Sequence, residues 1–102
     1  MHSVIESKRV ELAALCRQFH VRRLDLFGSA SGGDFDASRS DVDLLVEFEV
    51  GSNMMAFHQY FGLKEALATL LDRPVDLVMA SAVKNPYILR SIEATRENLY
   101  AA

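Results

Sequence analysis

The chain has 102 residues, of which half are apolar and a quarter are charged. This mixture is typical of a packed globular domain and excludes a disordered chain. We expect one domain over residues 1–102, because a domain typically takes roughly 100–200 residues. The formal net charge of −3 argues against a broad basic surface, so we expect no direct nucleic-acid partner.

The N-terminal segment and the single cysteine bear on the compartment. Charged residues near the start of the chain interrupt the apolar run that a signal peptide needs. No stretch approaches the roughly 18 apolar residues of a membrane-spanning helix, so we expect no membrane partner. Cys16 has no second cysteine with which to form an internal disulfide. The chain therefore fits a reducing compartment, and we expect it in the cytoplasm.

The first half of the chain predicts a helix and two strands. Apolar residues recur at helical spacing over residues 3–19, which indicates an amphipathic helix. Residues 21–27 alternate between two sides and stop at a glycine, which is typical of a strand. Residues 41–50 give the strongest strand prediction, because apolar and acidic residues alternate in their second half.

The second half predicts a long helix, a strand and a last helix. Residues 54–71 have helical periodicity, and Asp72-Arg73-Pro74 cannot continue the helix. A short strand follows over residues 75–80, and Asn85 with Pro86 opens the last helix as its N-cap and first residue. We expect the apolar face of the long helix, and the apolar residues at its start, to fill the core: Met54, Met55, Phe57, Tyr60, Phe61, Leu67 and Leu71. The apolar face of the last helix would be Ile88, Ile92 and Leu99.

Two aspartates open the strand at residues 41–50. Residues i and i+2 of a strand share a face, so Asp41 and Asp43 present their carboxylates side by side. At an effective dielectric near 20, two such charges repel by roughly 3 kcal/mol, and a divalent cation would turn this cost into a binding site. Oxygen ligands without a histidine or cysteine cluster suit Mg²⁺ or Mn²⁺. The alternative is an exposed strand that merely begins with acids.

The loop before these aspartates begins with Gly28 and Ser29. Glycine permits close approach of the backbone, and the serine adds a hydroxyl and an N–H for a phosphate. The alternative is a connector rich in turn-forming residues. Asp25, within the preceding strand, either points toward a site, faces solvent or pairs with Arg22 or Arg23.

The combined motif resembles the minimal nucleotidyltransferases of the DNA polymerase beta superfamily over nearly the whole chain. The match consists of Gly28-Ser29, eleven intervening residues, Asp41, Asp43, and Asp76 on a later strand. The resemblance implies an α+β fold, with a small mixed sheet flanked by helices as in the polymerase beta palm. It also implies the chemistry of a metal-dependent nucleotidyltransferase that uses ATP or another nucleoside triphosphate.

The resemblance also assigns roles to individual residues. Asp41, Asp43 and Asp76 would be catalytic and would hold the metal ions. The nucleotide would be bound by Gly28, Ser29 and Ser40. The family usually has a basic residue just after Gly-Ser, whereas this chain has Ala30-Ser31-Gly32-Gly33. Without that basic residue, phosphate binding would be weaker by roughly 1.5–3 kcal/mol for each charge-assisted hydrogen bond that a guanidinium would have made.

The family comparison further suggests the partner. The resemblance implies transfer of AMP to a hydroxyl of a small helical toxin of the HEPN type (higher eukaryote and prokaryote nucleotide-binding), as part of a toxin-antitoxin pair. A catalytically weak binding module that neutralises such a toxin by complex formation, or a nucleotide sensor, are the alternatives. The exposed edges of a small sheet also allow a homodimer.

Overall fold

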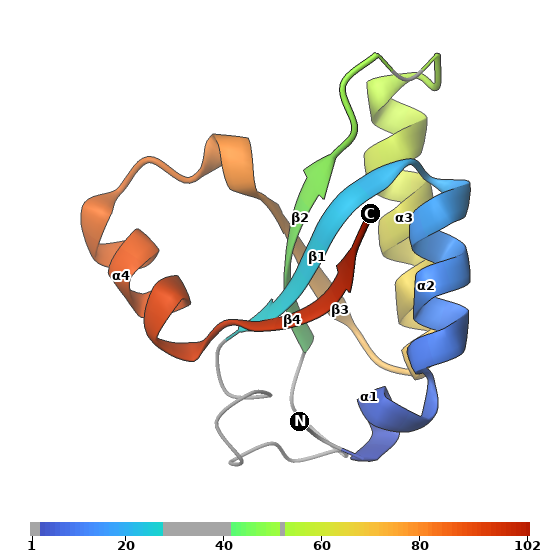
Figure 1. The fold of residues 1–102 in the computed structure, drawn as a ribbon, viewed down its shortest axis with the longest axis horizontal. Coiled ribbons are helices and arrows are strands. Elements are labelled where there is room, and N and C mark those ends of the chain that lie inside the picture. Colours follow the sequence, from blue (N-terminus) through green and yellow to red (C-terminus); the bar gives the residue numbers. More distant parts are fainter. Residues whose placement is uncertain (1–2, 28–41, 52) are drawn as a thin grey trace.

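The computed structural model describes residues 3–27, 42–51 and 53–102. Most of the predicted elements are present, with shifted boundaries (Figure 1). The elements are α1 (Ser3–Ser7), α2 (Arg9–Gln18), β1 (Val21–Phe27), β2 (Val42–Phe48), α3 (Ala56–Leu71), β3 (Val75–Met79), the 3-10 turn η2 (Ala80–Ala82), α4 (Pro86–Thr95) and β4 (Glu97–Ala101).

The strands form one mixed sheet in the order β3-β2-β1-β4. β1 pairs antiparallel with both β2 and β4, whereas β2 and β3 run parallel. A parallel pair needs a crossover connection, and α3 provides it. In Figure 1, α2 and α3 cover one face of the sheet, and α4 lies on the opposite side. The predicted α+β fold with a small mixed sheet is confirmed.

The core lies between the sheet and the helix pair α2 and α3. Alternation along the strands directs one set of side chains toward these helices, and the helices present residues at three- and four-residue spacing in return. Each such side chain contributes about 1.5–3 kcal/mol when fully buried. The most completely buried members include Leu12, Cys16, Leu24, Leu26, Leu44, Val46, Leu63, Leu67 and Leu77. Burial raises the pKa of the Cys16 thiol to about 12, so it stays protonated.

The last predicted helix is correct at its start and wrong at its end. Asn85 caps α4 by accepting a hydrogen bond from the Tyr87 N–H at 2.9 Å. The helix ends at Thr95, and Leu99 belongs to β4 rather than to a helical face. β4 pairs with β1 and buries Leu99 in the core. Pairing along an otherwise open edge of β1 therefore outweighs the helical spacing of the apolar residues.

The apolar residues at the start of α3 also differ from the prediction. Met55 and Phe57 are 74% and 71% exposed, and Phe61 is 49% exposed. Leu67 and Leu71 are buried as predicted, Tyr60 packs against the core, and Gln59 and Leu63 complete the buried face of α3. The amide of Gln59 donates a hydrogen bond to the Phe19 carbonyl at 2.9 Å, which makes its burial tolerable. The core-facing side of α3 therefore differs from the prediction in its first two turns and agrees with it toward its end.

Within the part of the chain that the structure describes, no helix has both the length and the apolar character needed to cross a membrane.

Candidate active site

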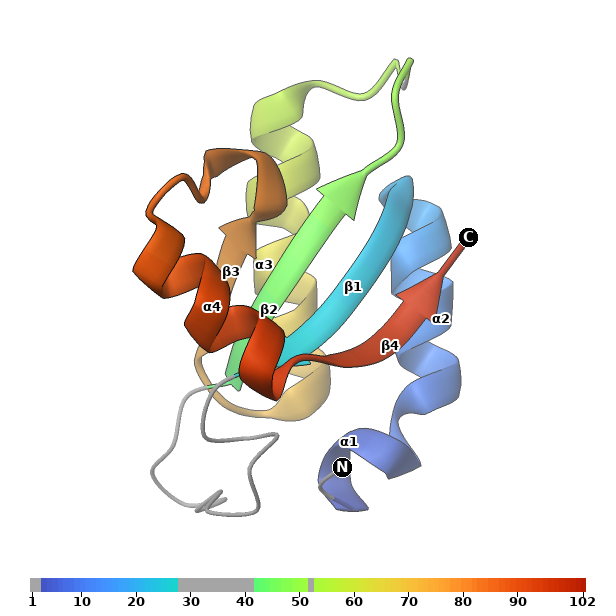
Figure 2. The same cartoon turned by 60° about the vertical axis from the view of Figure 1, so that its left-hand side comes forward.

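Asp43 and Asp76 are neighbours on adjacent strands. Asp43 of β2 stands opposite Asp76 of β3 in the parallel pairing, and opposite Phe27 of β1 on its other side. Adjacent strands lie about 4.7–4.9 Å apart, so the two carboxylates project side by side from one face of the sheet. Figure 2 shows β2 and β3 running parallel from the same end of the sheet. Asp76 is exposed and Asp43 is half-buried.

The remaining predicted site residues lie outside the described ranges. These are Gly28, Ser29, Ser40 and Asp41. Among residues 3–27, 42–51 and 53–102, no group of three histidine, cysteine, aspartate or glutamate side chains is arranged to hold a metal ion. The described part of the site therefore supplies a pair of carboxylates, and Asp41 is the predicted third member.

The electrostatics of this pair suit a cation. Two like charges opposite each other on neighbouring strands destabilise a sheet by about 0.2–1 kcal/mol. Hard oxygen donors on a partly exposed surface fit Mg²⁺ or Mn²⁺, which keep some water ligands and need few carboxylates from the protein. The donor set of Asp43 and Asp76 is therefore compatible with such an ion, although two carboxylates alone do not specify it.

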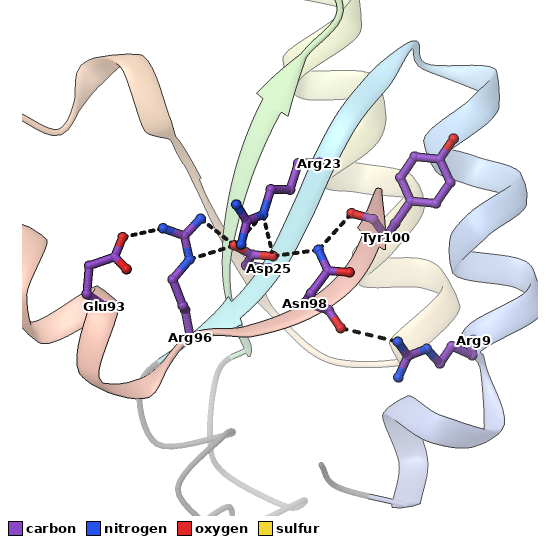
Figure 3. Close-up of polar contacts among 7 residues, drawn as sticks. All are labelled: Arg9, Arg23, Asp25, Glu93, Arg96, Asn98 and Tyr100. Atoms are coloured by element: carbon purple, nitrogen blue, oxygen red, sulfur yellow. Dashed lines mark hydrogen bonds and ion pairs between the residues drawn. The ribbon is translucent and has the colours of Figure 1, made fainter. Parts of the chain in front are cut away.

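A second acidic position on the same face has the opposite character. Asp25 and Phe27 of β1 are two residues apart and share a face, and Phe27 pairs with Asp43, so Asp25 faces the same side of the sheet as Asp43. The side chain of Asp25, however, is fully buried. Its carboxylate accepts hydrogen bonds from Arg23 Nε at 3.2 Å, Arg96 Nε at 2.7 Å and Asn98 Nδ2 at 2.9 Å (Figure 3). Of the alternatives for Asp25, pairing with Arg23 is observed.

Arg96 joins this buried carboxylate to the end of α4. Its side chain is 18% exposed, and its guanidinium forms ion pairs with both Asp25 and Glu93. Burial alone would lower the pKa of Arg96, but its hydrogen bonds to Asp25 and Glu93 raise it overall. Asn98 extends the network, because its amide also donates to the Tyr100 carbonyl and its own carbonyl accepts from Arg9 (Figure 3). Both carboxylate oxygens of Asp25 therefore accept hydrogen bonds from other side chains of the protein.

A pocket adjoins Asp76 on the side of α3. It has a volume of about 690 Å³, within the range of small-ligand sites. Its lining comes from α3 and from the start of β3: Phe61, Lys64, Glu65, Ala68, Pro74, Val75 and Asp76. Sequence reasoning missed this pocket because it assigned Phe61 to the core. Arg96 and Asn98 were missed because they lie 71 and 73 residues from Asp25 in sequence.

The chain matches a known protein family over most of its length. The model of the family described as "Nucleotidyltransferase domain" matches residues 11–98. The chain belongs to this family. A relative, protein adenylyltransferase MntA of Thermococcus cleftensis, is 36% identical over 85 residues, which cover 83% of this chain and 79% of the relative. The family match and this relative confirm the resemblance that the motif indicated.

Solved structures agree with the fold. A candidate minimal nucleotidyltransferase matches with a TM-score of 0.74 and 29% identity, over 90% of this nucleotidyltransferase and 89% of that chain. A second structure, a tri-AMPylated HEPN toxin of Shewanella oneidensis in complex with an MNT antitoxin, matches with a TM-score of 0.66 and 20% identity. That match covers 96% of this chain and 73% of the other, and it shows the shared fold.

Proposed function

We propose that this nucleotidyltransferase moves AMP from ATP to a hydroxyl group of a partner protein. The observation that carries the proposal is the side-by-side placement of Asp43 and Asp76 at the end of the sheet where β1 ends and β2 begins. The names of the relatives, which include a protein adenylyltransferase, support protein as acceptor and AMP as the transferred group. Membership in the family alone does not select either one.

The residues of the site have separable roles in this reaction. Gly28, Ser29 and Ser40 would hold the triphosphate between β1 and β2. Asp41, Asp43 and Asp76 would hold Mg²⁺ or Mn²⁺, which when bound neutralises phosphate charge and lowers the pKa of the acceptor hydroxyl. The family comparison is the source of these assignments, and the adjacency of the two described carboxylates agrees with them.

The bond changes are those of an in-line displacement. The acceptor oxygen forms a bond to the α-phosphorus, the bond from that phosphorus to the bridging oxygen breaks, and pyrophosphate leaves. Asp76 is exposed on the edge strand β3, so an acceptor can approach it from solvent. We assign Asp76 the removal of the hydroxyl proton. Positioning of the acceptor against the α-phosphate supplies much of the rate enhancement in such transfers.

A HEPN-type toxin is the proposed acceptor. The similar solved complex pairs an MNT antitoxin with an AMPylated HEPN toxin. By extension, this chain would act as the antitoxin of a pair and would silence its partner by adenylylation.

The test is transfer of label from α-labelled ATP to a purified HEPN-type protein encoded beside this chain. We expect Asp41→Asn combined with Asp43→Asn to abolish labelling while the thermal unfolding temperature stays within a few degrees of wild type. Glu49→Gln is the matched control, because Glu49 is an exposed acid beyond the opposite end of β2. Undiminished labelling by the double variant would refute the catalytic roles.

A second candidate function is neutralisation by binding alone. The segment Ala30-Ser31-Gly32-Gly33 lacks the basic residue that the family usually has there, and this favours a weakened grip on phosphate. Titration calorimetry with ATP and Mg²⁺ separates the candidates. Micromolar metal-dependent binding favours the enzyme, whereas silence at millimolar ATP favours the binding module. Tight binding without release of pyrophosphate would indicate a sensor.

A further inference from the structure

The exposed side of α3 carries aromatic residues that lead toward the candidate site. Phe57 and Phe61 lie one helical turn apart, and their ring centroids are 4.7 Å apart. Tyr60 contacts Phe61 edge-on with centroids 4.9 Å apart, and its hydroxyl donates a hydrogen bond to the Leu77 carbonyl of β3. Tyr60 is thus held to the edge strand, whereas Phe57 and Phe61 remain largely open to solvent.

This aromatic stripe, Phe57 and Phe61, is continuous with the pocket beside Asp76. Phe61 belongs to both the stripe and the pocket. Asp76 lines the pocket at the edge of β3, while its carboxylate projects from the face of the sheet opposite α3, because Val75 and Leu77 on either side of it are buried toward the core. Lys64 and Glu65, one charge of each sign, also line the pocket. A pocket without an excess of positive charge does not select a polyanion, so the triphosphate is a poor fit here.

The edge of β3 offers backbone groups at the same place. The Pro74 carbonyl accepts from the Val42 N–H at 3.1 Å and so points toward β2. The Leu77 carbonyl points away from β2, where it accepts from Tyr60. Because backbone groups alternate in direction along a strand, those of Val75 also face outward, next to the pocket that Val75 lines. An extended peptide can pair with such an edge.

The order of the strands separates the two substrates. The predicted triphosphate residues Gly28 and Ser29 follow β1, and β2 lies between β1 and β3. Asp43 on β2 therefore stands between the nucleotide side and the pocket side of the site. A group that reacts with the nucleotide would approach from β3.

We propose that this pocket, together with the aromatic stripe, is the acceptor subsite. It takes an extended polypeptide segment that passes around the outer edge of β3, with an apolar side chain against Phe61 on the α3 side and the hydroxyl-bearing residue at the Asp76 carboxylate on the other face. The proposal rests on the proposed transfer to a protein and adds where the acceptor binds.

The experiment compares Phe61→Asp with Ile88→Asp. The two side chains are matched, because Phe61 is 49% and Ile88 is 51% exposed, and Ile88 lies on α4. We expect Phe61→Asp to raise the KM for the HEPN-type protein at least tenfold and to leave the KM for ATP within twofold. Ile88→Asp should leave both values unchanged. Phe57→Asp, on the stripe but outside the pocket lining, should raise the KM for the protein by a smaller factor.

Three outcomes overturn the subsite. A higher KM for ATP in Phe61→Asp would make the pocket a nucleotide site. Equal effects of Phe61→Asp and Ile88→Asp would show that the pocket has no special role, and unchanged constants in both variants would show that no acceptor binds there. Unfolding temperatures of the variants identify any loss of fold.

Binding measurements separate this inference from the proposed function. If wild-type protein transfers no AMP, the proposed function fails, and the affinity for the same HEPN-type protein is then measured by calorimetry. A tenfold weaker complex with Phe61→Asp but not with Ile88→Asp would still support docking at this surface. Equal affinities would overturn it.

Discussion

Three aspartates on one face of the sheet lie in two opposite environments. Asp25 on β1 is fully buried, and arginine and asparagine side chains donate to its carboxylate. Asp43 and Asp76 on β2 and β3 are more open, and each has another carboxylate as its cross-strand neighbour. The first arrangement stabilises the protein by itself, whereas we propose that the second is stabilised when a cation binds. The same residue type therefore serves the fold at one position and, by our proposal, chemistry at the other.

The largest expected effect is on catalysis at the open pair. Asp43→Asn should lower the rate of AMP transfer by about 10²–10³-fold, because it removes a charged ligand of the proposed metal ions; this equals about 3–4 kcal/mol of barrier. Initial rates with α-labelled ATP measure the change, and urea denaturation checks that the variant is folded. A rate within threefold of wild type would contradict the contrast between the two positions.

The next effect is on stability at the buried position. Asp25→Asn should lower the free energy of unfolding by about 2–3 kcal/mol, because it removes the charge that Arg96 and Arg23 pair with; the solvent exposure of Arg23 keeps the loss below the 3–5 kcal/mol of a fully buried pair. Urea denaturation followed by circular dichroism measures it. A loss below about 0.5 kcal/mol would show that the network adds little.

Metal binding should distinguish the positions in a third way. Mg²⁺ at ten times its dissociation constant should raise the free energy of unfolding of the wild type by about 1.4 kcal/mol, since the ion binds the folded state only. The gain should vanish in Asp43→Asn and persist, on a lower baseline, in Asp25→Asn. Thermal scans with Mg²⁺ and with EDTA provide the measurement. Equal gains in wild type and Asp43→Asn would place the ion elsewhere.

The smallest effect is the relief of repulsion without metal. In EDTA, Asp76→Asn should raise the free energy of unfolding by about 0.2–1 kcal/mol, because it removes one of two like charges on neighbouring strands. Glu49→Gln, at an exposed acid beyond the opposite end of β2, is the control. Destabilisation by Asp76→Asn would mean that its carboxylate has a favourable structural partner.

The sequence by itself determined the local elements and the family. Alternation fixed β1 and β2, helical spacing and the proline after residue 73 fixed α3 and its end, and Asn85-Pro86 fixed the start of α4. These signals act between residues a few positions apart, so they can be read along the chain. The spacing of Gly28-Ser29, the aspartate pair and Asp76 sufficed to indicate a nucleotidyltransferase, and the family match confirmed it.

Only the tertiary structure decided which distant residues meet. The register that sets Asp43 beside Asp76, the partners of Asp25 more than seventy residues away, and the conversion of residues 97–101 to a strand all depend on the order of strands in the sheet. The exposure of Phe61 depends on which side of the first turns of α3 packs against the sheet. Local periodicity cannot encode these choices, because they arise from packing and pairing energies between segments remote in sequence.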